Sequence, residues 1–294
     1  MNNTLVTAIV ITHNRVKMLR NAINSVLNQT YPKIELIIVN DNSTDGTEEY
    51  LKKLKDQKKI QIINIMKKHS KGGGYARNIG IDKANGEYIA FLDDDDVWEP
   101  TKIEKQVKFL KGNPDYGLVY CRRLDMDYLK QKKKLEPLKG TMSGNMSNIC
   151  FEKTICTSSS MMVRKKVLDE VGGFDENLRF WQDFELNIRI AHNTLIGFIN
   201  EPLMIYSVGN NDKGKLTNKF NGWWEAIKYI ETKHEGYFSN LSHESILKWE
   251  VMIYKDAARR CKKSRLFRQE RQYRYKVWRL EKSLYNLIRL VVNY

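Results

Sequence analysis

The sequence predicts an α/β fold with a mostly parallel sheet flanked by helices, followed by a C-terminal helical extension. Two observations lead to this fold class. Over residues 5–120, short apolar runs rich in β-branched residues alternate with segments whose apolar residues recur at helical spacing. This order is typical of parallel strands joined by right-handed crossover helices. In addition, a polar cluster directly follows three of the runs, at the strand ends where such sheets bind ligands.

The elements follow from the patterns in chain order. We expect strands at 6–11, 34–39, 60–66 and 88–92, with helices between them at 15–28, 44–54 and 75–84. Further along we expect a helix at 102–110, a strand at 117–121, an irregular basic stretch at 122–150, a strand at 156–163, helices at 165–171 and 181–192, and a strand at 198–206. Only helical signals follow residue 218, so we predict two domains, 1–215 and 216–294.

Composition bounds the class of protein. Hydrophobic residues make up 41% and charged residues 29% of the 294 residues, as in a soluble globular protein. The four cysteines are scattered, which argues against a disulfide framework or a zinc site. The N-terminus has no signal-peptide pattern, and no apolar run is long enough to span a bilayer. We therefore expect a cytoplasmic protein.

Four consecutive carboxylates, Asp93–Asp96, follow the predicted strand at 88–92. Adjacent carboxylates repel one another, and a hard divalent cation would offset that cost and bridge to a diphosphate. The alternative is a solvated acidic turn, but the apolar run before the aspartates and Trp98 after them favour a turn held in place. In an extended chain Asp93 and Asp95 share one side, which leaves Asp96 as a candidate cap for the next helix.

Three further positions are candidates for ligand contact. Asp41 ends the second predicted strand and could accept hydrogen bonds from a base or ribose, or form an Asx-turn. Arg77 lies one turn after the glycines at 72–74, which could hold a phosphate or form a structural turn. Asp183 begins a predicted helix, where it could be a helix cap or the general base for an acceptor hydroxyl.

The chain resembles the inverting glycosyltransferases of family 2, which have the GT-A fold, over roughly residues 5–210. The matching pieces, in order, are the segments 9–15, 25–30, 35–47, 76–78, 86–96 and 172–176. They include the sequences Ile-Val-Ile-Thr-His-Asn-Arg, Asn-Asp-Asn-Ser-Thr-Asp-Gly-Thr, Ala-Arg-Asn, Phe-Leu-Asp-Asp-Asp-Asp and Gly-Gly-Phe-Asp-Glu.

This resemblance implies a role for each candidate. Residues on the donor side would be Thr12, His13 and Arg15 around the nucleobase, Asp41 on the base, Arg77 on the nucleotide, Asp93 on the ribose or the metal, and Asp94 as a further donor contact. Asp95 would be the main metal ligand of the family's D-x-D motif, with Asp93 as a second, and Asp183 would be the catalytic base. Two positions depart from the family: Gln182 stands where a Glu is common, and 69–71 lacks an expected Asn.

The implied activity is a metal-dependent glycosyl transfer, with Mn²⁺ or Mg²⁺ as the cofactor. The sugar would pass from a nucleotide-diphosphate donor, with UDP favoured, to a hydroxyl of a glycan or lipid-linked glycan of the capsule, lipopolysaccharide or teichoic-acid type. A nucleotidyltransferase is an alternative, but it should carry a glycine-rich basic loop where Thr12–Arg15 stands. A non-catalytic glycan-binding or nucleic-acid-binding protein is another.

The C-terminal region is strongly basic. Residues 246–294 carry 14 Lys and Arg against 4 Asp and Glu, out of a net charge of +15 for the chain. Aromatic residues are interleaved with these cations, and Leu280, Leu284, Leu287, Ile288 and Val291 fall at helical spacing. Such a helix suits an anionic membrane surface, so we expect peripheral attachment to the inner face of the cell membrane. A helical cap or a homo-oligomer interface are alternatives; no nucleic-acid partner is expected, because no RNP, KH or zinc motif occurs.

Overall fold

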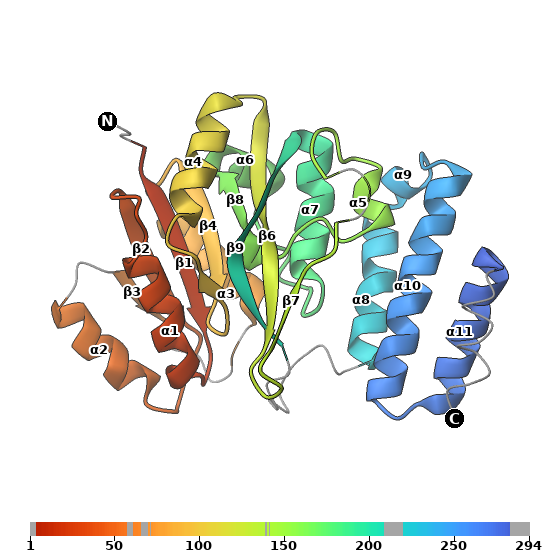
Figure 1. Cartoon of the computed structure of the whole chain (residues 1–294), viewed down its shortest axis with the longest axis horizontal. Coiled ribbons are helices and arrows are strands. Elements are labelled where there is room, and N and C mark those ends of the chain that lie inside the picture. The colour runs from red at the N-terminus through yellow and green to blue at the C-terminus, as the bar shows by residue number, and fades with distance from the viewer. Residues whose placement is uncertain are drawn as a thin grey trace.

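The computed structural model describes residues 4–57, 61–65, 70, 72–138, 140, 142–208 and 220–282. Figure 1 shows the N-terminal strands at one side, the long central strands in the middle and the C-terminal helices at the other side. The predicted boundary near residue 215 lies outside the described residues. No helix within those ranges is long and apolar enough to cross a bilayer.

One mixed sheet organises the described chain. Its strands are β1 (Val6–Thr12), β2 (Ile34–Asn40), β3 (Gln61–Asn64), β4 (Tyr88–Asp93), β5 (Val97–Trp98), β6 (Tyr116–Asp127), β7 (Lys132–Leu135), β8 (Met161–Arg164) and β9 (Leu195–Val208). They lie in the order β3-β2-β1-β4-β8-β6-β9-β5, and β7 pairs with β6. The first four strands are parallel, and β8 joins β4 and β6 in antiparallel fashion. The predicted fold class is thus confirmed.

The helices connect and cover these strands. They are α1 (Val16–Leu27), α2 (Thr47–Gln57), α3 (Gly73–Lys83), α4 (Lys102–Gly112), α5 (Ile149–Glu152), α6 (Lys165–Val171), α7 (Gln182–Asn193), α8 (Phe220–Lys233), α9 (Glu235–Phe238), α10 (His243–Lys263) and α11 (Phe267–Glu281). A 3₁₀ turn, Ser158–Ser160, precedes β8.

Alternate residues of each parallel strand face opposite layers, as the two-residue repeat of a strand requires. Val10 of β1 packs in the layer that includes α1 and α4, whereas Ile9 packs in the layer that includes α3 and α7. Both faces of these strands are therefore buried. This burial explains why β1, β2 and β4 read as continuous apolar runs rather than alternating ones.

The C-terminal helices share the core of the sheet domain. Trp223 of α8 is fully buried and its ring lies 5.7 Å from that of Trp181, at the start of α7. Trp249 of α10 packs 5.8 Å from Phe184 of α7. Since these aromatic rings fill the junction, the described part of the C-terminal region forms a helical cap on the sheet domain (Figure 1).

Two sequence predictions were wrong. The stretch 122–150 is not irregular throughout, because β6 continues to Asp127 and forms a hairpin with β7. Residues 122–127 of β6 are half-buried on both faces and β7 is exposed, so the apolar signal of a strand is weak there. The strand expected at 156–163 is shorter, because the amide of Ser160 donates to the carbonyl of Thr157 at 3.0 Å and closes a 3₁₀ turn. The hydroxyl of Ser160 donates to the same carbonyl.

Candidate active site

The four aspartates form a turn at the end of β4 in which they alternate in exposure. The amide of Asp96 donates to the carbonyl of Asp93 at 3.1 Å and closes the turn. The side chains of Asp93 and Asp95 are 33% and 14% exposed, whereas that of Asp94 is 4% exposed and Asp96 is buried. As the alternation predicted, Asp93 and Asp95 are the more accessible pair.

Asp94 joins the aspartate turn to the end of β1. Its carboxylate accepts hydrogen bonds from the hydroxyl of Thr12 at 2.7 Å and from Nη1 of Arg15 at 3.0 Å. Burial raises the pKa of Asp94 to about 6, although Arg15 acts in the opposite direction. The same guanidinium lies 3.6 Å from Asp95. Thr12, Arg15 and Asp94 therefore form one cluster, as their common sheet edge predicted.

Asp96 is a structural residue, but not in the way the sequence predicted. It does not cap α4, which begins at Lys102 after Thr101. Instead its carboxylate accepts from the amide of Ser207 at 3.2 Å, at the end of β9, while the hydroxyl of Ser207 donates to the carbonyl of Asp95. The short strand β5 intervenes before α4 and carries Asp96 away from that helix. Burial raises the pKa of Asp96.

Arg77 connects the aspartate turn to helix α7. Its Nη2 lies 2.5 Å from Asp93, and its Nη1 donates to the side-chain oxygen of Gln182 at 3.1 Å. A Cβ at Gly73 would lie only 2.8 Å from Nη1. Gly73, the first residue of α3, thus allows Arg77 to approach α7, a packing role that the sequence pattern left open beside phosphate binding.

His13 and Asp41 lie next to this cluster, at the ends of β1 and β2. The amide of Asp41 donates to the carbonyl of Thr12 at 2.9 Å, and its own carbonyl lies 2.6 Å from Nδ1 of His13. The carboxylate of Asp41 accepts from the amide of Gly72 at 3.1 Å and from the hydroxyl of Ser70. Ser70 is the described member of the departing segment 69–71. The predicted convergence of three strand ends is therefore present.

Asp183 lies in the first turn of α7, whose N-cap position is occupied by Trp181 with a φ of 56°. Asp183 and Asp93, with Arg77 between them, line one cavity of about 1060 Å³. Burial raises the pKa of Asp183; Arg77 lowers it, and the charge of Asp93 raises it. A carboxylate with a raised pKa, beside a cavity, is suited to accept a proton.

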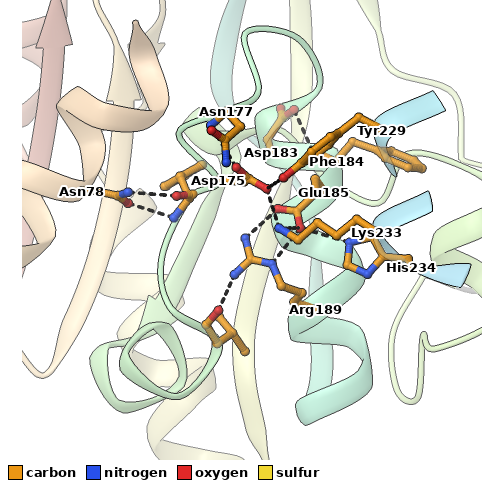
Figure 2. Close-up of polar contacts among 12 residues, drawn as sticks. Asn78, Asp175, Asn177, Asp183, Phe184, Glu185, Arg189, Tyr229, Lys233 and His234 are labelled. Atoms are coloured by element: carbon orange, nitrogen blue, oxygen red, sulfur yellow. Dashed lines mark hydrogen bonds and ion pairs between the residues drawn. The ribbon is translucent and has the colours of Figure 1, made fainter. Parts of the chain in front are cut away.

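A buried ionic network is centred on Glu185, two residues after Asp183 in the same helix (Figure 2). The carboxylate of Glu185 accepts from Arg189 at 2.6 Å, from His234 at 3.0 Å and from Lys233 at 2.8 Å. Lys233 also bonds to Asp175, which accepts a hydrogen bond from the hydroxyl of Tyr229. The network joins α7 to the turn at 172–176 and to the C-terminal helices.

Sequence reasoning missed several residues of the cavity. They are Ser158, which lies 3.3 Å from Arg77, Gln182 as the partner of Arg77, and the α10 cations Arg259, Arg260 and Lys263. The three consecutive serines at 158–160 were a visible signal. No pattern links α10 to the cavity, because that contact depends on how the C-terminal helices pack.

The carboxylates suit a divalent cation only in part. The part of the chain that the structure describes holds no group of three His, Cys, Asp or Glu side chains able to bind a metal. Asp93 and Asp95 are hard oxygen donors in a turn of four carboxylates, next to two guanidiniums, those of Arg15 and Arg77. This donor set fits an ion that completes its coordination with phosphate oxygens of a ligand.

Comparison with known proteins agrees with this geometry. Residues 7–172 match the family model for glycosyl transferase family 2. A Methanocaldococcus jannaschii protein described as an uncharacterized glycosyltransferase is 33% identical over 259 residues, 86% of this chain and 87% of that protein. A Rickettsia bellii protein described likewise is 34% identical over 227 residues, 75% of this chain but only 31% of its own length.

Two solved structures share the fold at low identity. S. aureus TarS 1–349 in complex with UDP-GlcNAc has a TM-score of 0.65 and 17% identity, over 94% of this chain and 80% of that one. The Pyrobaculum calidifontis mannosyltransferase in complex with GDP-Man and Mn²⁺ has a TM-score of 0.58 and 17% identity, over 98% and 86%. Since the family model covers more than half of the residues, the chain belongs to glycosyltransferase family 2, with the GT-A fold and the enzyme class that its motifs predict.

Proposed function

We propose that this protein transfers a sugar from a nucleotide-diphosphate donor, UDP in the first instance, to a hydroxyl of a cell-surface glycan precursor, with inversion at the anomeric carbon. The observation that carries the proposal is the cavity lined by both Asp93 and Asp183, where Arg77 bonds to Asp93 and to Gln182, the residue before Asp183. A donor-side carboxylate and a candidate base at one cavity are what a direct displacement requires.

The donor would lie along the ends of β1, β2 and β4. Thr12, His13, Arg15 and Asp41, which lie together at the ends of β1 and β2, would surround the nucleobase, and Asp93 and Asp94 would contact the donor from the end of β4. Arg77 would contact the nucleotide while it holds Asp93 in place. The UDP-GlcNAc complex of S. aureus TarS, a protein of the same fold, supports a uridine nucleotide as the first choice.

Asp95, together with Asp93, would hold a Mn²⁺ or Mg²⁺ ion. The bound cation would neutralise the leaving diphosphate. The accessibility of these two carboxylates and the Mn²⁺ in the related mannosyltransferase support this assignment. The remaining two aspartates hold the turn, through Thr12 and Ser207.

Asp183 would remove the proton of the acceptor hydroxyl as that oxygen attacks the anomeric carbon. The raised pKa makes its carboxylate a stronger base than a solvated one. The amide of Phe184 donates to it at 2.9 Å and fixes its orientation. Arg77 donates a hydrogen bond to the side chain of Gln182, and this bond fixes the orientation of the first residue of α7. The base would therefore stay aligned between two fixed neighbours.

The test is a panel of sugar nucleotides incubated with the full chain and Mn²⁺, with product analysis. We expect one donor, a UDP-sugar, to raise the melting temperature and to be hydrolysed slowly to UDP and free sugar when no acceptor is present. Formation of UTP and sugar 1-phosphate from the donor when inorganic diphosphate is added would instead indicate a nucleotidyltransferase. Binding of a glycan without turnover of any donor would indicate a non-catalytic binding protein.

The location that fits this acceptor is the inner face of the cell membrane. The exposed aromatic side chains Phe267 and Tyr275 of α11, in a region rich in Lys and Arg, support a contact with anionic lipid. Trp249 of α10, by contrast, is buried against the sheet domain. A membrane contact would therefore involve α11 more than α10.

A further inference from the structure

Two cavities meet at the C-terminal helices. The first is the cavity of Asp93 and Asp183 described above. The second, of about 1130 Å³, lies against α10, α11 and residues 152–154. Thr154, Trp181, Arg259 and Lys263 line both. A ligand in the second cavity could therefore extend past these four side chains toward Asp183.

The second cavity has an apolar floor. The apolar residues that line it are Leu247, Val251, Met252 and Ala258 of α10 and Val277 of α11. They are half-buried or buried and recur along one side of α10 at helical spacing. A floor of this kind binds an aliphatic chain by removing apolar surface from water.

The rim of this cavity is basic. Seven lining residues are cations and three are anions: Lys153, Lys248, Lys255, Arg259, Lys262, Lys263 and Arg274 against Glu152, Asp256 and Glu281. The three anions already pair with Lys248, Arg259 and Lys255. The lining residues by themselves carry a net charge of +4, from seven minus three, and Arg274 is also paired with Glu270 of α11.

The cations nearest the catalytic cavity are well placed for a phosphate. Arg259 and Lys263 are four residues apart on α10, so they lie on one face of the helix. Both are exposed and line both cavities, and Arg259 also forms an ion pair with Asp256 of the same helix. Arginine and lysine are the side chains that bind phosphate groups most often.

We propose that the α10–α11 cavity binds the apolar chain of a lipid-linked acceptor, and that Arg259 and Lys263 bind its phosphate groups, so that its sugar reaches Asp183. This assignment rests on the proposed function, because it names the acceptor class for the same active site. The site has three features in sequence: an apolar floor, two cations and a carboxylate base. This order matches that of lipid, phosphate and sugar in such a molecule.

A lipid phosphate explains more of the surface than other anionic ligands do. A water-soluble phosphate polymer would use the cations but leave the apolar floor without a function. A flat anionic membrane would use the cations but has no component that extends to Asp183. The four side chains that line both cavities therefore favour a single amphiphilic molecule.

The experiment measures binding to the full chain by isothermal titration calorimetry, with UDP and Mn²⁺ at saturation to fill the donor site. The probes are farnesyl diphosphate, farnesol and inorganic diphosphate. We expect farnesyl diphosphate to bind at least about tenfold more tightly than either fragment, because only it contacts both the floor and the cations. The variants Arg259→Gln and Lys263→Gln should each weaken that binding by about three- to tenfold, the loss of one charge-assisted contact.

Two further variants sharpen the test. Val251→Asn, at the half-buried floor, should weaken farnesol and farnesyl diphosphate alike, provided its melting temperature is unchanged. Arg268→Gln removes an exposed cation of α11 that lines neither cavity, and should bind all three probes as the parent protein does. Since Arg259, Lys263 and Arg268 are all exposed, their substitution should not unfold the protein.

Several outcomes would overturn the proposal. If inorganic diphosphate and farnesyl diphosphate bind equally tightly, the site recognises only the charged group. If Arg259→Gln and Lys263→Gln both bind farnesyl diphosphate as tightly as the parent protein does, the ligand binds elsewhere. Competition between farnesyl diphosphate and UDP would place it in the donor site. Binding only to phosphatidylglycerol vesicles would indicate a membrane surface. Donor hydrolysis without acceptor, measured on the same preparation, separates the two proposals. If the probes bind normally but the donor is not hydrolysed, the glycosyl-transfer proposal is rejected. If the donor is hydrolysed but the probes do not bind, the lipid-acceptor proposal is rejected.

Discussion

Glu185 and His234 are joined by a 3.0 Å hydrogen bond from Nε2 of the histidine to the carboxylate. Glu185 lies two residues after Asp183 in α7, and His234 directly follows α8. Both side chains are buried. The bond therefore connects the helix of the proposed base to the junction of α8 and α9 in the C-terminal region (Figure 2).

The Glu185→Gln variant should be destabilised at neutral pH. Burial acts to raise the pKa of Glu185, but hydrogen bonds from His234, Arg189 and Lys233 outweigh it and lower the pKa from 4.5 to about 2. A lowered carboxylate pKa adds stability above about pH 4.5 that is lost as the pH falls toward 2. We expect a loss of about 3 kcal/mol at pH 7 and a shallower acid dependence, measured by urea unfolding from pH 7 to 3.

The control for this variant is Glu170→Gln, at an exposed position of α6. It should unfold as the parent protein does at every pH. Equal stability of the parent and Glu185→Gln proteins at pH 7 would contradict the role given to the network.

The Asp183→Asn variant should bind the donor but fail to transfer the sugar. An amide keeps the shape of the side chain but cannot accept the hydroxyl proton, so turnover should fall by about 10²- to 10⁴-fold. The measurement is transfer rate together with the donor-induced shift in melting temperature. Asp169→Asn, an exposed change on α6, is the matched control. Full transfer by Asp183→Asn would exclude it as the base.

The Arg77→Lys variant should weaken donor binding although it keeps the positive charge. Arg77 contacts both Asp93 and Gln182 through separate nitrogens, and one ammonium group cannot reproduce that forked geometry. We expect about tenfold weaker donor binding and a loss of stability of about 1–3 kcal/mol, because Arg77 is buried. The exposed change Lys83→Gln, in the last turn of the same helix, should have neither effect. A parent-like affinity would mean that charge alone suffices.

Chelation with EDTA should abolish transfer, and added Mn²⁺ should restore it. The Asp95→Asn variant should need about tenfold or more Mn²⁺ for half-maximal activity, because it removes one charged ligand. Asp96→Asn is the comparison: Asp96 is buried and bonded to Ser207, so its Mn²⁺ dependence should match that of the parent protein. Transfer that persists in EDTA would refute the metal requirement.

Flotation with vesicles tests the membrane contact. The full chain should float with phosphatidylglycerol vesicles and much less with phosphatidylcholine vesicles, because the contact is electrostatic as well as apolar. The combined variant Phe267→Ser, Arg268→Gln, Arg279→Gln alters three exposed residues of α11 and should reduce flotation severalfold. A change at distant exposed cations, Lys52→Gln and Lys53→Gln in α2, should not. Unchanged flotation of the α11 variant would exclude that helix as the contact.

The sequence by itself determined the parallel half of the fold and the donor-side candidates. Strands buried on both faces leave long apolar runs, and the polar residues that follow them must meet at one sheet edge. Thr12, Asp41 and the aspartate turn can be grouped in this way from the sequence alone. Asp93 and Asp95 could also be separated from Asp94 by strand alternation alone.

Only the tertiary structure decided the partners of these residues and the far side of the cavity. Asp96 contacts Ser207, 111 residues away, and Arg77 contacts Gln182, 105 residues away. Arg259 and Lys263 reach the cavity because Trp181, Trp223 and Trp249 fix how α10 docks on α7. Such contacts depend on how helices from distant segments pack together. The spacing of residues within one segment does not predict that packing.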